Sequence, residues 1–217
     1  MALKHVRAIM TRISGGLGLD EPVLTKIGRE TRDPFQVLIS CILSLRTRDE
    51  TTAGASDRLF ALCRDPTRMR RLAPRTIEKA IYPVGFYKTK ARRIIEICCL
   101  LADQYESRVP DSLDALLALP GVGPKTANIV LVYGFGKPGL PIDTHCHRIP
   151  NRIGWVSTRT PEETEQVLRK ELPKRYWMLF NDLFVQFGQN ICKPIGPRCS
   201  TCVINRYCEK RGVKTRH

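Results

Sequence analysis

Leu119-Pro-Gly-Val-Gly-Pro-Lys-Thr-Ala127 is the stretch that decides the fold, because it has the pattern of a tight turn between two helices (hereafter the hairpin). Pro124 suits the first position of the second helix, where its missing N–H is no loss. Gly121 and Gly123 lack a Cβ atom, so another backbone can approach the turn closely. Free N–H groups at such a helix start suit a phosphate oxygen. The stretch therefore predicts a phosphate-binding turn formed by Gly121, Val122 and Gly123.

Lys125 and Asp143 are oddly placed if they serve stability alone. Lys125 falls in the first turn of the second helix, where the macrodipole disfavours a cation. That field, with partial burial, would lower the pKa of the amine and leave it more often a neutral nucleophile. Asp143 follows Pro141 and precedes a helical pattern, so it is a natural N-cap. Each has an ordinary alternative, a surface lysine that touches phosphate and a capping aspartate. Together, beside the hairpin, they predict a Lys/Asp active site.

The charge balance predicts a polyanionic partner. The 217 residues contain 36 Lys and Arg against 21 Asp and Glu, which gives a net charge of +15. Nucleic acid is the polyanion that such a basic chain usually meets. An anionic membrane is the alternative, but the sequence contains no lone basic amphipathic helix and no lipidation motif. We therefore expect nucleic acid as the partner and no membrane.

The first residues of the sequence lack the uncharged core of a secretory signal, and no apolar run reaches about 18 residues. We therefore expect a cytoplasmic (nucleoid-associated) or nuclear protein that is not secreted. Such a reducing setting disfavours disulfides among the nine cysteines. Five of them lie in helical patterns and are interpreted as small buried hydrophobic residues: Cys41, Cys63, Cys98, Cys99 and Cys146.

Apolar residues recur at helical spacing along most of the chain, and no stretch shows the alternation of a convincing strand. The sequence therefore predicts an all-α protein. A glycine turn at Val84–Tyr87 resembles the hairpin in pattern, which makes it either a second backbone-contacting turn or merely a similar loop. The expected helices lie at 1–20 (ending at Gly15-Gly16), 34–45, 50–62, 88–104, 143–153, 161–171 and 174–188, with further starts at Pro66, Pro74 and Pro110.

Four further cysteines close to the C-terminus have the spacing C-x6-C-x2-C-x5-C. Four thiolates this close in sequence can surround a tetrahedral site without the rest of the fold. Zinc is one alternative, but its usual arrangement has two separated Cys-x2-Cys pairs, whereas a 4Fe-4S cluster tolerates uneven spacing. With four cysteine ligands no position is open to substrate, so we expect a structural or DNA-docking role that includes Lys193 and Arg198. The four ligands would be Cys192, Cys199, Cys202 and Cys208.

The hairpin with Lys125, the segment Ile-Asp143-Thr-His and the cysteine spacing together resemble endonuclease III, the iron–sulfur member of the helix-hairpin-helix DNA glycosylases. The resemblance runs from about Phe35 to Cys208. It implies two helical lobes with a DNA-binding cleft between them, a 4Fe-4S cluster, and a monomer that acts on damaged double-stranded DNA. A monovalent cation at the hairpin is a further expectation. The implied domains are a helical barrel at 22–136, which contains the hairpin, and an iron–sulfur domain made of 1–21 and 137–217.

The resemblance also implies a mechanism. An oxidised pyrimidine nucleotide is flipped out of the duplex, and the Lys125 amine attacks C1′ and displaces the base. Asp143 would stabilise the cationic sugar and help to deprotonate the incoming amine. The resulting Schiff base makes the 2′ hydrogen acidic, and β-elimination then cuts the strand 3′ to the lesion.

Two positions depart from the pattern of the family or need interpretation. The glutamine that enters the gap left by the flipped base is Arg46 in this sequence, which can donate to the orphaned base but accepts no hydrogen bond. The opposite-base preference is therefore open. Phe86 stands where the family has a bulky apolar wedge, and an aromatic ring there can stack between bases; its alternative is a core phenylalanine. Lys88 and Lys90 are expected to contact phosphate or solvent.

Three other functions are alternatives for this sequence. Asp143-x-His145-x-His147 could ligate a divalent metal in a nuclease, but residues two apart on a helix point in diverging directions. His145 is better interpreted as a DNA-pocket or core residue. A monofunctional mismatch or uracil-type glycosylase of the same fold is disfavoured by Lys125, although Arg46 leaves it open. The last alternative is a non-catalytic DNA-binding module.

Overall fold

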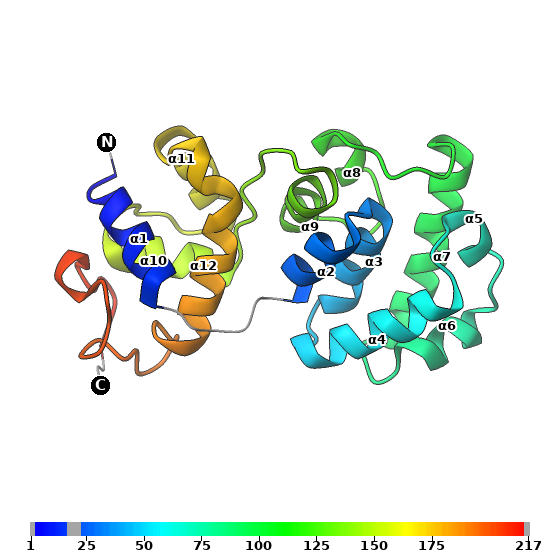
Figure 1. Ribbon diagram of the computed structural model, residues 1–217, viewed down its shortest axis with the longest axis horizontal. Helices are drawn as coiled ribbons and strands as arrows, with labels where there is room; N and C mark the ends of the chain where they lie inside the picture. The colour runs from blue at the N-terminus through cyan, green and yellow to red at the C-terminus, as the bar shows by residue number, and fades with distance from the viewer. Residues whose placement is uncertain (1–2, 17–22, 215–217) are drawn as a thin grey trace. The chain divides into compact units, whose positions relative to one another are not determined.

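The computed structural model describes residues 3–16 and 23–214, and the regular structure in these two ranges is helical, without a strand. The all-α prediction is therefore confirmed. The chain divides into two compact units (Figure 1). The hairpin unit is Val23–Lys137, and the cysteine unit consists of the described residues of Met1–Pro22 and Pro138–His217. The domain boundary predicted near residue 21 lies outside the described residues.

The hairpin unit is built around one buried helix, α3 (Pro34–Ser44). Every side chain from Val37 to Leu43 is buried, so the helix is covered on all sides, as a helix that is apolar around its whole circumference must be. It packs against α2, α4, α7, α9 and η1. Its neighbours in this unit are α2 (Val23–Thr31), α4 (Asp49–Leu62), α5 (Pro66–Met69), α6 (Pro74–Ile81), α7 (Tyr87–Gln104), α8 (Leu113–Leu117), α9 (Pro124–Ile129) and the π-helix η1 (Val130–Gly134).

The start of α3 follows from the sequence Asp33-Pro34. The Asp33 carboxylate accepts hydrogen bonds from the N–H groups of Phe35 (2.9 Å) and Gln36 (3.4 Å), and Pro34 occupies the first turn. This is the arrangement in which an N-cap satisfies helix donors that have no partner within the helix. The helix ends at Ser44 with Leu45 as its C-cap, and the loop that contains Arg46 begins there.

The cysteine unit joins parts of the chain that are far apart in sequence. Trp155 donates from Nε1 to the carbonyl of Lys4 (2.9 Å), and the rings of Phe180 and Phe184 stack at a centroid distance of 4.1 Å in the core. Helix α1 therefore packs with segments that lie more than a hundred residues later. The elements are α1 (Val6–Gly16), α10 (Thr144–Ile153), α11 (Pro161–Glu171), the 3-10 turn η2 (Lys174–Tyr176), α12 (Trp177–Asn190) and the 3-10 turn η3 (Asn205–Tyr207).

Three details differ from the sequence prediction. Helix α2 was not predicted, because Gly28 and the polar residues around it give the segment the composition of a loop. The helix expected from Pro110 begins later, since the Ser112 hydroxyl accepts from the N–H of Ala115 and caps the five-residue α8. The helix expected over 174–188 begins as a 3-10 turn, and its α-helical part is Trp177–Asn190.

Gly28 gives a test of how α2 packs. A Cβ atom at this position would lie 2.4 Å from the Cβ of Tyr133 in η1, so Gly28→Ala would push α2 away from η1. We expect the free energy of unfolding to fall by about 1–3 kcal/mol, as for other overpacked cores. Gly15→Ala is the matched control, because nothing lies within 4 Å of a Cβ there, and it should leave stability unchanged or raise it by up to about 1 kcal/mol. Chemical denaturation followed by circular dichroism measures both, and equal effects would contradict this packing.

Candidate active site

The hairpin consists of α8, a turn and α9, as the sequence predicted. Gly121 has φ +76°, a left-handed conformation that favours glycine, and the Val122 N–H donates to the Leu119 carbonyl (3.1 Å). A Cβ at Gly121 would also lie 3.4 Å from the Cδ of Arg93 in α7, whereas one at Gly123 would meet nothing within 4 Å. The turn therefore needs glycine at position 121 for its left-handed conformation. At Gly123 the backbone is not covered by other atoms.

Lys125 is the second residue of α9, in the first turn as predicted. Its side chain is exposed, so the expectation of partial burial is wrong. Its ammonium group lies close enough to the Cys41 thiol in α3 to act on it electrostatically. Burial raises the pKa of Cys41 to about 12, and the Lys125 charge works in the opposite direction. The amine thus stands at the surface of the hairpin unit, above an inert thiol.

A pocket in the hairpin unit joins three residues that the sequence had identified separately, Arg46, Phe86 and Gly121. The open space there, including the part continuous with solvent, is about 790 Å³. The glycine turn at Val84–Tyr87 and the hairpin therefore meet at one pocket, and contact of that turn with a DNA backbone stays a prediction. The pocket is lined by Ile42, Leu45, Arg46, Phe86, Thr89, Lys90, Arg93 and Gly121.

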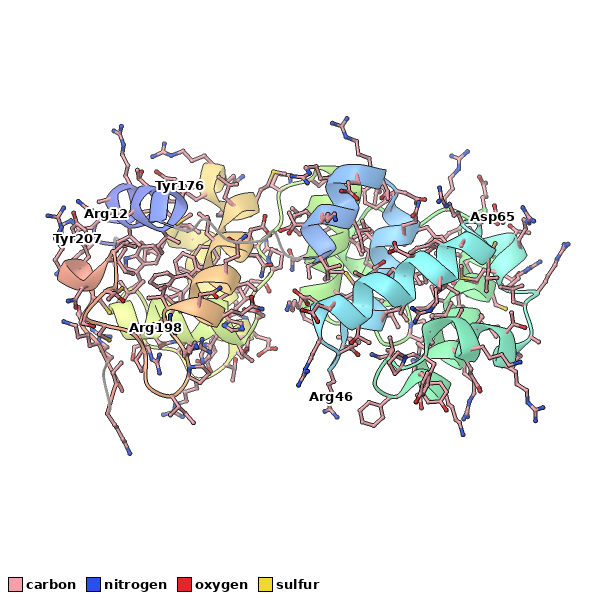
Figure 2. The ribbon with its side chains drawn as sticks, turned by 60° about the horizontal axis from the view of Figure 1, so that its bottom comes forward. Arg12, Arg46, Asp65, Tyr176, Arg198 and Tyr207 are labelled. Carbon is pink, nitrogen blue, oxygen red and sulfur yellow. The ribbon has the colours of Figure 1, made fainter. Side chains whose placement is uncertain are left out.

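Arg46 and Phe86 form an exposed pair at this pocket. The guanidinium carbon of Arg46 lies 5.8 Å from the ring centroid of Phe86, within the range of a cation–π interaction. Phe86 is 64% exposed, which excludes the alternative of a core phenylalanine. Both residues have left-handed backbones, with φ +55° and +58°, and each such residue costs about 1–3 kcal/mol that the surroundings must supply. Figure 2 shows Arg46 extending outward from the ribbon.

Lys88 and Lys90 have different surroundings, although both were expected to contact phosphate or solvent. Lys88 is exposed and keeps that expectation as a prediction. For Lys90 the expectation is wrong, because its side chain is only 7% exposed and its ammonium donates to backbone carbonyls. Burial lowers the pKa of Lys90 to about 8.

Asp143 is the N-cap of α10, as predicted. Its Oδ1 atom accepts hydrogen bonds from the N–H groups of His145 and Cys146, both at 2.8 Å, and the residue is half-buried. The cap orients the carboxylate at the helix N-terminus, where the helix dipole favours its charged form. Lys125 belongs to the hairpin unit and Asp143 to the cysteine unit.

His145 and His147 serve different partners within the cysteine unit. The Nδ1 atom of His145 lies 3.0 Å from Nη2 of Arg148, and its ring packs against Gly188 in α12. The Nδ1 atom of His147 lies 2.7 Å from the Thr164 hydroxyl. The two rings do not converge with Asp143 on a common point, so the divalent-metal alternative finds no support in this geometry. His145 is half-buried and packs within the cysteine unit, and its contact with DNA stays a prediction.

The four C-terminal cysteines line one cavity. Arg152, which is buried in α10, holds the loop that contains them by donating to the carbonyls of Lys193 (2.6 Å) and Pro194 (2.7 Å) and to the Cys192 sulfur (3.4 Å). Cys208 in turn donates its thiol to the Arg152 carbonyl (3.4 Å). Sequence analysis missed Arg152; its spacing of four residues from Arg148, on the helix that Asp143 caps, was the available signal.

Comparison with known proteins agrees with these observations. Residues 39–174 match the family model of the HhH-GPD superfamily base excision DNA repair proteins. The endonuclease III of Thermotoga maritima is 54% identical over 177 residues, which are 82% of this chain and 83% of that protein. Two solved structures, a non-covalent endonuclease III–DNA complex and a trapped endonuclease III–DNA covalent intermediate, have TM-scores of 0.86 and 0.79. Each is 31% identical to this chain; they cover 97% and 94% of it, and it covers 96% and 95% of theirs.

The chain belongs to the endonuclease III family. It is therefore an enzyme of base-excision repair, a DNA glycosylase with AP lyase activity. In the part of the chain that the structure describes, no helix is long and apolar enough to cross a membrane.

The endonuclease III family is known for a 4Fe-4S cluster, and the four thiols fit such a group in donor type. Burial, together with the neighbouring thiols Cys192, Cys208 and Cys199, raises the pKa of Cys202 to about 11 against the opposing effect of a backbone hydrogen bond from Ile204, so the Cys202 thiol stays protonated until a metal replaces its proton. Among the described residues, no three His, Cys, Asp or Glu side chains are placed to hold a single metal ion. The fit therefore rests on the four sulfurs around one cavity.

The remaining predicted DNA contacts have mixed exposure. Arg198 is exposed and Lys193 is half-buried, with its carbonyl bonded to Arg152. Val122 is buried beneath the hairpin turn, while Gly121 and Gly123 are exposed. Their contacts with DNA stay predictions, and no observation on the described residues supports a monovalent cation at the hairpin.

Asp143 can be tested as a cap separately from any chemical role. Asp143→Ala should lower the free energy of unfolding by about 1 kcal/mol because two N–H groups lose their acceptor, whereas Asp143→Asn keeps an acceptor and should stay near the wild-type value. Tryptophan fluorescence measures this directly, since Trp155 and Trp177 both lie in the cysteine unit. A fall in the free energy of unfolding as large in Asp143→Asn as in Asp143→Ala would contradict the capping role.

Proposed function

We propose that this enzyme removes oxidised pyrimidines from duplex DNA and cuts the strand at the same site, with Lys125 as the nucleophile. One observation carries the proposal: Lys125 is an exposed residue of the hairpin, whose Gly121 lines the same pocket as Arg46 and Phe86. A flipped nucleotide leaves a gap in the duplex, and these two exposed side chains are of the kind that can fill it. The similarity to an endonuclease III–DNA complex supports DNA as the partner.

The chemistry follows from an amine at that position. The nitrogen of Lys125 forms a bond to C1′, and the base leaves with the electron pair of the glycosidic bond. After the nitrogen loses its proton, the sugar ring opens to a protonated Schiff base between Lys125 and C1′. That cation makes the 2′ hydrogen acidic, and its loss expels the 3′ phosphate and cuts the strand. Water then hydrolyses the Schiff base and releases the free lysine.

We assign Asp143 the role of the carboxylate partner. Its charge is held at the α10 N-terminus by two N–H groups, so it keeps a fixed orientation without reorganisation during the reaction. A carboxylate in such a position stabilises positive charge on the sugar and accepts a proton from the attacking amine. Asp143→Asn, which keeps the cap, separates this role from the stability of the fold.

We further propose that Cys192, Cys199, Cys202 and Cys208 hold a 4Fe-4S cluster. Such a cluster is coordinated fully by the four thiolates, so it supplies structural order and no open position for substrate. The loop that it would fix contains Lys193 and Arg198, two cations suited to phosphate. None of the nine cysteines, all of which lie in the described part of the chain, forms a disulfide, which fits a reducing compartment such as the cytoplasm or the nucleus. We also propose that the enzyme acts as a monomer.

Borohydride trapping tests Lys125. Wild type incubated with duplex DNA that contains an oxidised pyrimidine should give a covalent protein–DNA adduct after reduction, and Lys125→Gln should give none because it has no amine to form the Schiff base. Lys79→Gln, which changes an exposed lysine on α6, is the control and should give as much covalent adduct as wild type.

The other outcomes identify the alternatives. Release of free base without an adduct in wild type would indicate a monofunctional glycosylase. Neither product on any lesion would leave only a DNA-binding module. An undiminished adduct in Lys125→Gln would overturn the proposed nucleophile.

Metal analysis tests the cysteine site. Protein purified without oxygen should contain iron and acid-labile sulfide in equal amounts and no stoichiometric zinc, and Cys202→Ser should lose both together with the visible absorption. Stoichiometric zinc without sulfide in wild type would show that the site is a zinc site instead. The control is Cys99→Ser, a half-buried cysteine of the hairpin unit, which should keep the iron.

A further inference from the structure

Lys90 is a buried lysine whose role in catalysis the proposed mechanism leaves open. Its ammonium donates to the carbonyls of Leu43 (2.8 Å) and Leu45 (2.5 Å), and its third polar contact is the Thr47 hydroxyl (3.2 Å). An ammonium has three donors, so all three are used. It is 7% exposed and lines the pocket at the Arg46–Phe86 pair.

The three acceptors surround the position of Arg46 in the chain. Leu43 lies in the last turn of α3 and Leu45 is its C-cap, and a cation is favourable there because the last helix carbonyls lack partners within the helix. Leu45 and Thr47 are the two chain neighbours of Arg46. Lys90 thus binds the backbone just before Arg46 and the side chain just after it, around a residue that has the left-handed φ of +55°.

The glycine turn completes this support. A Cβ atom at Gly85 would lie 3.0 Å from the carbonyl oxygen of Arg46 and 3.7 Å from the Thr47 hydroxyl, so the turn packs directly on the Arg46 loop. Phe86 follows immediately and lies beside the Arg46 guanidinium. Lys90 comes from the first turn of the helix that Phe86 begins, so one helix start both carries Phe86 and holds the loop of Arg46.

We propose that Lys90 is a positioning residue for base excision: it holds residues 43–47 in the conformation in which Arg46 enters the gap opposite the flipped nucleotide. This rests on the proposed function, in which Arg46 and Phe86 fill that gap. Lys90 itself touches neither DNA nor the reacting sugar. Its effect on the reaction passes through Arg46.

The test compares Lys90→Met, Lys90→Arg and Arg46→Ala. Two rates are measured, base release from duplexes with one oxidised pyrimidine opposite each of the four bases, and strand cutting at an abasic site in single-stranded DNA, which has no gap to fill. Lys90→Met should slow base release from duplex DNA about ten- to a hundredfold, since a small misplacement of a positioning side chain lowers a rate by about this factor. It should also change the preference among the four opposite bases in the same way as Arg46→Ala does. Cutting of the single strand should stay within about twofold.

The variants also separate a positioning role from a general loss of structure. Lys90→Arg keeps the charge, but a planar guanidinium cannot direct donors to three acceptors around one point, so it should show the same selective loss in duplex. Adding Lys90→Met to Arg46→Ala should cause no further change in opposite-base preference. The matched control is Lys79→Met, an exposed lysine on the helix that packs against α7, and it should behave as wild type.

Several results would overturn the inference. One is wild-type base release and opposite-base preference in both Lys90 variants. Another is an equal loss on duplex and single strand, which would indicate a structural role only. A third is slow base release from duplex DNA by Lys90→Met together with wild-type base release by Arg46→Ala, which would show that Lys90 does not act through Arg46. In each of these cases trapping at Lys125 still succeeds, so failure of the inference is distinguishable from failure of the proposed function.

Discussion

The burial of α3 is the constraint on which the site in the hairpin unit depends. Asp33 fixes where the helix begins, and Lys90 binds the carbonyls at the position where it ends. Between these points the helix is covered on all sides, so it cannot shift along its axis without opening the core. Arg46 lies in the loop that follows the C-terminal end of α3, and α9, which contains Lys125, packs against α3. One helix thus sets the place of both the proposed nucleophile and the proposed gap-filling residue.

Two glycine turns contribute residues to one pocket, and each needs its glycine for a different reason. Gly121 adopts a left-handed backbone above the Arg93 side chain, and Gly85 lets its turn approach the Arg46 carbonyl. Each turn leads into a helix with basic residues in its first turn, Lys125 in one and Lys88 and Lys90 in the other. The helix dipole disfavours cations at these positions, so their presence indicates a use other than stability. Lys90 is buried and binds groups inside the protein, whereas Lys125 is exposed.

Those parts of the site that depend on local sequence could be predicted, and those that depend on distant packing could not. The hairpin, the cap by Asp143 and the cysteine spacing are signals within a few residues, and the predicted hairpin and cap agree with the structure. Lys90 was misinterpreted because its acceptors lie more than forty residues earlier in the chain. Helix α2 was missed because a glycine such as Gly28 is typical of a loop in the sequence. Its role is to let α2 pack closely against Tyr133 of the π-helix, and that contact is visible only in the structure. The exposure of Lys125 likewise depends on how α9 packs against α3, which no local pattern contains.

The central claim is that the amine of Lys125 forms the covalent bond to the deoxyribose. Mass spectrometry of the reduced protein–DNA adduct, after digestion of both components, tests it most directly by locating the residue that carries the sugar remnant. We predict a single modified peptide, with the added mass on Lys125. The same mass on the N-terminal amine, on Lys88 or on any other lysine, with Lys125 unmodified, would contradict the account.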